Sequence, residues 1–124
     1  MKNLIIIIAL VSFNAFSQDS WSFTPDKQKH FFFGGVPSMV TSATISNLNP
    51  DQPKYLKGFL VGSSVGVGLN LAKEGFDLLG FGHPSYHDLA YGALGSIIGS
   101  AVGVGLAYTV NKLENRIKKR KLKL

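Results

Sequence analysis

The sequence of 124 residues contains no cysteine and few charged side chains, which make up 16% of it. The absence of cysteine excludes a disulfide-stabilised scaffold, thiolate metal sites, thiol redox chemistry and a cysteine-linked lipid anchor. Charge is scarce compared with a soluble domain, where about a quarter of the residues are charged. Glycine is abundant, with 14 residues, but it lies within apolar runs and not in linkers. The length allows a single domain.

The N-terminal residues 1–17 have the pattern of a secretory signal peptide. Lys2 supplies a positive charge, residues 4–11 form an uninterrupted apolar region, and small residues precede a cleavage point ahead of Gln18. An uncleaved first membrane helix is the alternative. The sequence thus predicts an exported chain in three parts: signal peptide 1–17, helical membrane domain 18–111 and basic tail 112–124.

Three apolar segments follow at 31–48, 55–72 and 89–110, and Lys57, near the start of the second, is the one charged residue within them. Each is close to the roughly 20 residues that a bilayer-spanning helix needs. Small residues recur at four-residue steps on one face of each segment, which lets membrane helices approach closely. They are Gly34, Ser38, Ser42 and Ser46, then Gly58, Gly62 and Gly66, then Gly95, Gly99 and Gly103. We therefore predict an all-α fold, a compact three-helix membrane bundle with Gly/Ser packing ridges; a soluble Gly-rich helical bundle in the periplasm is the alternative.

Capping and breaking residues predict where these helices begin and end. Thr24 followed by Pro25 is typical of a helix start, and Pro37 inside the first segment predicts a kink. Residues 49–51 (Asn-Pro-Asp) indicate a turn. The second helix is expected to continue to about residue 79 and to break at 80–82 (Gly-Phe-Gly). The spacing of Ser85 and Asp88 resembles a capping box that opens the third helix.

Basic residues are concentrated in the tail, and this predicts orientation. Residues 112–124 hold seven Lys or Arg and one Glu, whereas residues 18–111 are nearly neutral. The positive-inside rule places the tail in the cytoplasm, and residues 18–30 and 73–88 then face the periplasm. We expect an inner-membrane protein of the bacterial envelope, with the periplasm as the alternative location. The bilayer is the main partner, and anionic lipid headgroups suit the tail; nucleic acid is excluded because no aromatic residues alternate with the tail charges.

Polar side chains gather on the predicted periplasmic side, in residues 26–30 and 73–88. Carboxylates and imidazoles in this combination could act as general acid and base or ligate a divalent metal, the one cofactor that they suggest. The catalytic candidates are Asp26, His30, Glu74, Asp77 and Asp88, with Lys27, Lys73 and Ser85; the metal candidates are His30, Glu74, Asp77 and His87, with Asp88 as a further oxygen donor. The alternative for each residue is a local role at a helix end, and for His83 an exposed loop position.

The same residues carry a resemblance to known families over about residues 25–105. DKQKHFFFGG at 26–35, KEGFD at 73–77 and SYHDLAYGALGSIIG at 85–99 resemble the YfiM-type family of periplasmic lipoproteins of unknown function and, more weakly, the VanZ-like membrane family. The chain departs from the lipoproteins in having no cysteine to acylate. The resemblance implies that the site comprises Asp26, Lys27, His30, Lys73, Glu74, Asp77, Ser85 and Asp88, but it implies no chemistry.

The function predicted from these features is that of a small exported membrane protein of the envelope, without an assigned reaction. The alternative is a small membrane enzyme or metal-binding protein that acts on a lipid-linked or cell-wall substrate. Glycine ridges are also compatible with a homo-oligomer. The sequence indicates neither a substrate nor a protein partner.

Overall fold

The structure, a computed structural model, describes residues 22–48 and 51–124, and this part of the chain is almost entirely helical. It contains helix α2 (Pro25–Leu48), helix α3 (Lys54–Phe76), the short π-helix η1 (Asp77–Phe81) and helix α4 (Tyr86–Leu122). The predicted all-α class is confirmed. The predicted signal peptide and its cleavage point lie outside the described residues.

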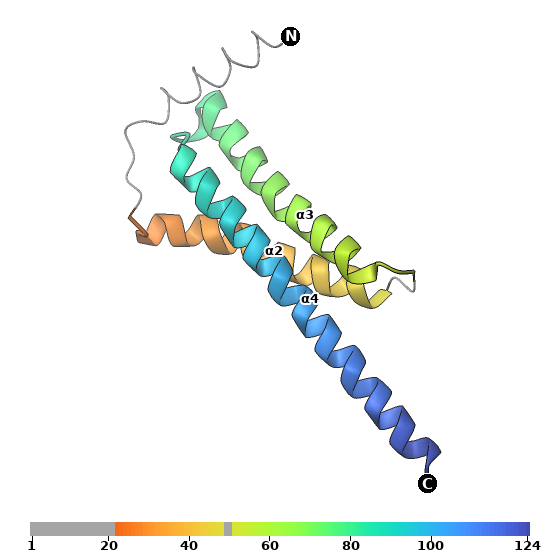
Figure 1. Cartoon of the computed structure of the whole chain (residues 1–124). Coiled ribbons are helices and arrows are strands. Elements are labelled where there is room, and N and C mark those ends of the chain that lie inside the picture. The colour runs from red at the N-terminus through yellow and green to blue at the C-terminus, as the bar shows by residue number, and fades with distance from the viewer. Residues whose placement is uncertain (1–21, 49–50) are drawn as a thin grey trace.

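Helices α3 and α4 lie side by side with opposite chain directions, and α2 crosses them (Figure 1). All three helices contact one another. The ends that meet are the start of α2, the end of α3 and the start of α4. The C-terminal part of α4 projects beyond the other two helices. Helix α4 continues through residue 112 without a break, so most of the basic tail is part of the same helix as the third apolar segment.

Helix boundaries follow the local sequence closely. Helix α2 begins at Pro25, as predicted, and it continues as one helix across Pro37. Helix α3 passes into η1, where Gly80 has a φ of 101°. That left-handed conformation is open to glycine at little cost, so Gly80 ends the helical path close to the predicted break.

The interior of the bundle consists of small and polar residues. Ser38, Ser42 and Ser46 of α2 are fully buried, and Gly58, Gly62 and Gly66 of α3 lie against them. A Cβ atom on Gly62 would lie only 2.7 Å from the carbonyl oxygen of Ser38. A side chain at these glycine positions would collide with α2, so the ridges predicted from the four-residue spacing are the helix contact surfaces.

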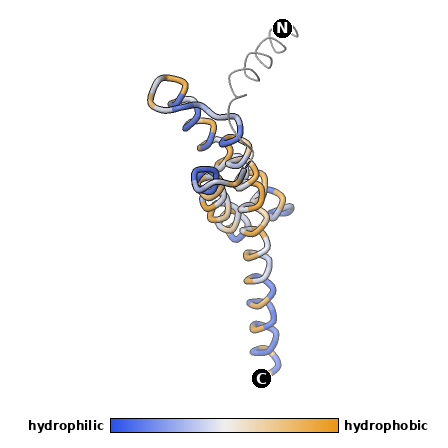
Figure 2. Tube along the Cα trace, turned by 90° about the vertical axis from the view of Figure 1, so that its left-hand side faces the viewer, coloured by the Kyte–Doolittle hydropathy of each residue, from blue (hydrophilic) through white to orange (hydrophobic). Residues whose placement is uncertain are grey.

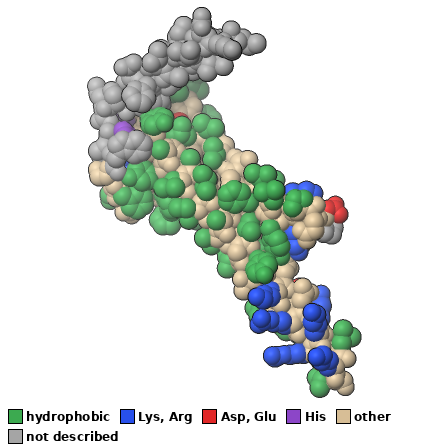
Figure 3. All heavy atoms as spheres, in the orientation of Figure 1, with side chains coloured by type: hydrophobic (Ala, Val, Ile, Leu, Met, Phe, Trp, Pro, Cys, Tyr) green, Lys and Arg blue, Asp and Glu red, His purple; other side chains and the backbone are tan. Residues whose placement is uncertain are grey.

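Large apolar side chains point outward instead. Leu60, Val40 and Ile97 are each about half exposed, and Ala107 is the one buried hydrophobic side chain in the described part of the chain. Figure 3 shows such side chains covering the visible face of the bundle, while Lys and Arg line the projecting end of α4. This distribution is the reverse of a water-soluble core, in which aliphatic residues are the most buried.

One of the described helices, α4, is long and apolar enough to span a membrane. Its sequence changes along its length: the part within the bundle is largely apolar, whereas the projecting C-terminal part is hydrophilic (Figure 2). The described helices α2 and α3 do not meet the same criterion. By length and composition, α4 is therefore the described helix that could cross a membrane.

Candidate functional site

Three helix ends bring charged side chains together in the interior of the protein. Lys27 and His30 lie three residues apart on one face of α2, Glu74 lies near the end of α3, and Asp88 lies in the first turn of α4. All four side chains are buried. We call the group that they form with their direct neighbours the helix-end cluster: Lys27, His30, Lys73, Glu74, Asp77, Ser85 and Asp88.

Asp88 connects α4 to α2. Its Oδ1 atom lies 2.7 Å from Lys27 Nζ, which donates a hydrogen bond to it, and its Oδ2 atom lies 3.3 Å from His30 Nε2. The Lys27 and Asp88 side chains are 4% and 7% exposed. Because a charge removed from water is costly unless it is paired, each ion of this pair holds the other in place, and the pair joins residues 61 positions apart.

Lys73 connects α3 to the same network. Its Nζ atom lies 2.6 Å from Asp77 Oδ2, one helical turn away, and 3.3 Å from Glu74 Oε1. Burial alone lowers the pKa of Lys73, but hydrogen bonding and attraction from Asp77 and Glu74 outweigh burial, so the pKa lies above its usual value of 10.5. Lys73 is therefore a cation at physiological pH. The same ammonium group lies 3.2 Å from His30 Nε2.

Glu74 completes the cap at the start of α4. Ser85 is the N-cap residue, and its hydroxyl oxygen accepts a hydrogen bond from the backbone N–H of Asp88 at 3.2 Å. In a capping box the third helical residue would return a bond to the backbone N–H of the cap. Here that N–H donates to Glu74 Oε2 at 2.8 Å. Because α3 supplies the second half of the cap, the Asp88 carboxylate can pair with Lys27.

The remaining candidate residues do not belong to the helix-end cluster, although one of them lies close to it. Asp26 is exposed. One carboxylate oxygen of Asp26, one ring nitrogen of His30 and one carboxylate oxygen of Asp88 nevertheless lie within 4.8 Å of one another. His87 is buried but does not belong to that group, and His83 is exposed. Of the metal candidates, His30 and the further oxygen donor Asp88 fall in this group of three, whereas Glu74, Asp77 and His87 do not.

Sequence reasoning missed Asn70, the largest fully buried side chain described. Its Nδ2 atom donates to the carbonyl oxygen of Gly66 at 2.9 Å. A Cβ on Gly34 or on Gly92 would collide with its amide group, so Asn70 fills the junction of all three helices. The available signal was its position four residues after Gly66, on the small-residue face of an otherwise apolar segment.

The cluster borders a surface hollow of about 320 Å³ lined by Asp26, Lys29, His30, Phe33 and Lys73. The position of the His30 ring decides whether this residue could act as a catalytic base in the hollow. Its Nε2 atom faces both Asp88 and Lys73, and its Nδ1 atom is buried without a hydrogen-bond partner among the described residues. A catalytic base must present one nitrogen to the substrate. Both nitrogens are instead held inside the protein, which favours a structural role for this imidazole.

The fold and the cluster together define a class: an all-helical protein with a small-residue interior, an apolar exterior and an ionic network where three helix ends meet. No family model matches the chain, and none of the curated proteins or solved structures is detectably similar to it. The resemblance to the YfiM-type and VanZ-like families therefore stays a prediction.

Proposed function

We propose that this chain is a small non-enzymatic membrane protein of the bacterial envelope, in which all three helices cross the bilayer and the helix-end cluster fixes their ends at the periplasmic face. The observation that carries the proposal is the inverted distribution of side chains. Serine, glycine and asparagine fill the interior, whereas leucine, valine, isoleucine and phenylalanine cover the exterior. In lipid, packing of small residues stabilises helix contacts without a hydrophobic driving force.

The position of the charges supports the same proposal. Lys27, Lys73 and Asp88 each lie just outside the apolar segments 31–48, 55–72 and 89–110. Lys57 is the one Lys, Arg, Asp or Glu within these segments, and it lies near the start of its segment, where a long side chain can extend to the interface. The segment 89–110 would extend about 33 Å as a helix, which matches a hydrocarbon thickness of about 30 Å. Charges within that thickness are costly. In the proposed orientation the helix-end cluster lies at the membrane surface, where the partly exposed side chain of Lys73 can reach water.

Labelling of single cysteines tests the insertion of all three helices, and the cysteine-free native chain is the control for unspecific reaction. We expect His83→Cys, at an exposed position outside the helix-end cluster, to react with a membrane-impermeant maleimide from the periplasmic side. Asp51→Cys and Lys121→Cys should react only after the cells are lysed, and the protein should stay in the membrane at alkaline pH. Equal labelling of the Asp51 and His83 variants in intact cells, with release by alkaline carbonate, would instead identify a soluble periplasmic bundle.

A metal-binding or acid–base site is the second candidate function, and one observation favours it. Oxygen and nitrogen atoms of Asp26, His30 and Asp88 lie within 4.8 Å of one another beside the hollow. However, the ammonium groups of Lys27 and Lys73 already contact Asp88 and His30, and a divalent cation would have to displace them. Metal analysis of the purified protein after zinc or manganese loading separates the two: one bound equivalent that Asp88→Asn abolishes supports the second candidate.

A further inference from the structure

We propose that a hollow at the opposite end of the bundle binds the phosphate-bearing headgroup of one acidic phospholipid. The hollow measures about 360 Å³ and lies between the start of α3 and the projecting part of α4. The side chains that line it are Tyr55 from α3 and Tyr108, Asn111, Lys112, Asn115, Arg116 and Lys119 from α4. The inference rests on the proposed membrane insertion, because it assigns the hollow to the level of the headgroups.

The side chains that line the hollow carry three positive charges. Lys112, Arg116 and Lys119 follow one another at steps of four and three residues, which places them along one side of α4. None of the described residues that line the hollow is acidic. A guanidinium group can donate two parallel hydrogen bonds to a phosphate, and the amides of Asn111 and Asn115 add neutral donors. The donor set therefore fits an anion with several oxygens.

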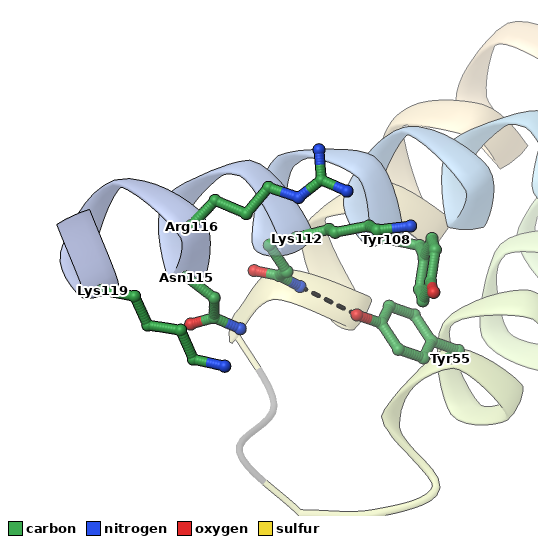
Figure 4. A pocket seen from close by; sticks show the side chains of 7 residues that line it. Tyr55, Tyr108, Lys112, Asn115, Arg116 and Lys119 are labelled. Atoms are coloured by element: carbon green, nitrogen blue, oxygen red, sulfur yellow. Dashed lines mark hydrogen bonds between the residues drawn. The ribbon is translucent and has the colours of Figure 1, made fainter.

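Two tyrosines form the wall on the side of the bundle. The rings of Tyr55 and Tyr108 contact edge to face with centroids 5.7 Å apart, and Lys112 Nζ lies 5.9 Å from the centroid of Tyr108. Asn111 Nδ2 donates to the Tyr55 hydroxyl at 3.1 Å. Figure 4 shows Lys112 and Arg116 extending along α4 toward Tyr108. The site is therefore built from two helices and held by contacts between them.

The place of the hollow along α4 indicates which phosphate it receives. Tyr108 lies in the last turn of the apolar segment 89–110, and Lys112 begins the basic part. Tyrosine prefers the boundary between hydrocarbon and water, and Lys and Arg just beyond it attract anionic lipid. A lipid seated here would have its phosphate against the three cations and its chains along the apolar exterior. Free inorganic phosphate shares the chemistry but gains nothing from that exterior.

Native mass spectrometry of the full chain in neutral detergent, titrated with phosphatidylglycerol or with phosphatidylcholine, tests the site. The native chain should retain one phosphatidylglycerol in preference to phosphatidylcholine. The triple variant Lys112→Gln, Arg116→Gln, Lys119→Gln should bind it about 100-fold more weakly, at about fivefold for each lost charge. The matched control Lys118→Gln, Lys121→Gln, Lys123→Gln removes the same charge outside the hollow and should lose less than about threefold. Circular dichroism checks that both variants remain helical.

Three results would overturn the inference. Equal loss in the two triple variants would mean that the tail attracts lipid by its overall charge alone. Equal retention of the two phospholipids would mean that the hollow does not select an anion. Displacement of phosphatidylglycerol by millimolar inorganic phosphate would assign the hollow to the free ion. A chain that stays in the membrane but fails these tests refutes only the headgroup site, whereas a chain released by alkaline carbonate refutes the proposed insertion.

Discussion

Neutralising Asp88 provides the sharpest test of the helix-end cluster. Asp88→Asn keeps the shape of the side chain and the backbone N–H that Ser85 caps, but it leaves the buried Lys27 ammonium without its 2.7 Å counter-ion. At that separation and an effective dielectric constant of about 20, the attraction amounts to about 6 kcal/mol, much of which offsets desolvation. Removing one partner of a buried pair costs about 3–5 kcal/mol, and we expect a loss of that size in the free energy of unfolding.

A compensating variant makes this prediction specific. Lys27→Met together with Asp88→Asn removes both charges and keeps the volume, so the double variant should be more stable than Asp88→Asn alone by at least about 2 kcal/mol. Unfolding by SDS in mixed micelles can be followed by energy transfer between dyes on Thr24→Cys and His83→Cys. These exposed positions lie just before the starts of α2 and α4, which the pair of Lys27 and Asp88 joins. A single-variant loss below about 1 kcal/mol, or strict additivity in the double variant, would refute the buried ion pair as a stabilising element.

Three further outcomes are expected in the same unfolding assay. Glu74→Ala should destabilise by about 1–3 kcal/mol because the backbone N–H of Ser85 loses its acceptor, whereas Glu74→Gln keeps an acceptor and should lose clearly less. Gly66→Ala should destabilise by about 1–3 kcal/mol because its Cβ would collide with the facing helices, while Gly68→Ala, with nothing within 4 Å, should be neutral or stabilising by up to about 1 kcal/mol. EDTA should leave the unfolding midpoint unchanged, and a drop that zinc restores and that His30→Ala abolishes would contradict the non-enzymatic proposal.

Much of the fold could be predicted because the spacing of glycine and serine indicates which face of each helix packs against its neighbours. A four-residue step returns to the same side of a helix, so Gly58, Gly62 and Gly66 had to form one narrow face. What the spacing could not supply is which faces meet. The placement of Ser42 against Gly62, and of Asn70 at the junction with Gly92, depends on long-range packing that a single sequence does not encode locally.

For the site, the sequence predicted which residues form the cluster better than which of them bind one another. Lys27, His30, Glu74 and Asp88 were all named, because charged residues beside apolar segments stand out. The local capping rule predicted that Asp88 serves its own helix start, with a reciprocal bond to Ser85. In the structure the backbone N–H of Ser85 donates to Glu74 instead, and the Asp88 carboxylate accepts a hydrogen bond from Lys27. An acceptor eleven residues upstream competes for the Ser85 N–H, and only the assembled fold brings it within reach.

The inverted interior also explains why average hydropathy singles out α4 while the proposal includes α2 and α3. An average over a helix mixes the side that faces lipid with the side that faces other helices. In α3 the inward side is glycine and Asn70, which lower the mean, whereas the outward side carries leucine and valine. For a membrane helix only the outward side needs to match the lipid. The buried polar residues of α2 and α3, Ser38, Ser42, Ser46 and Asn70, therefore lie where no lipid would reach. Cysteine labelling on either side of α3 tests directly whether this helix crosses the bilayer.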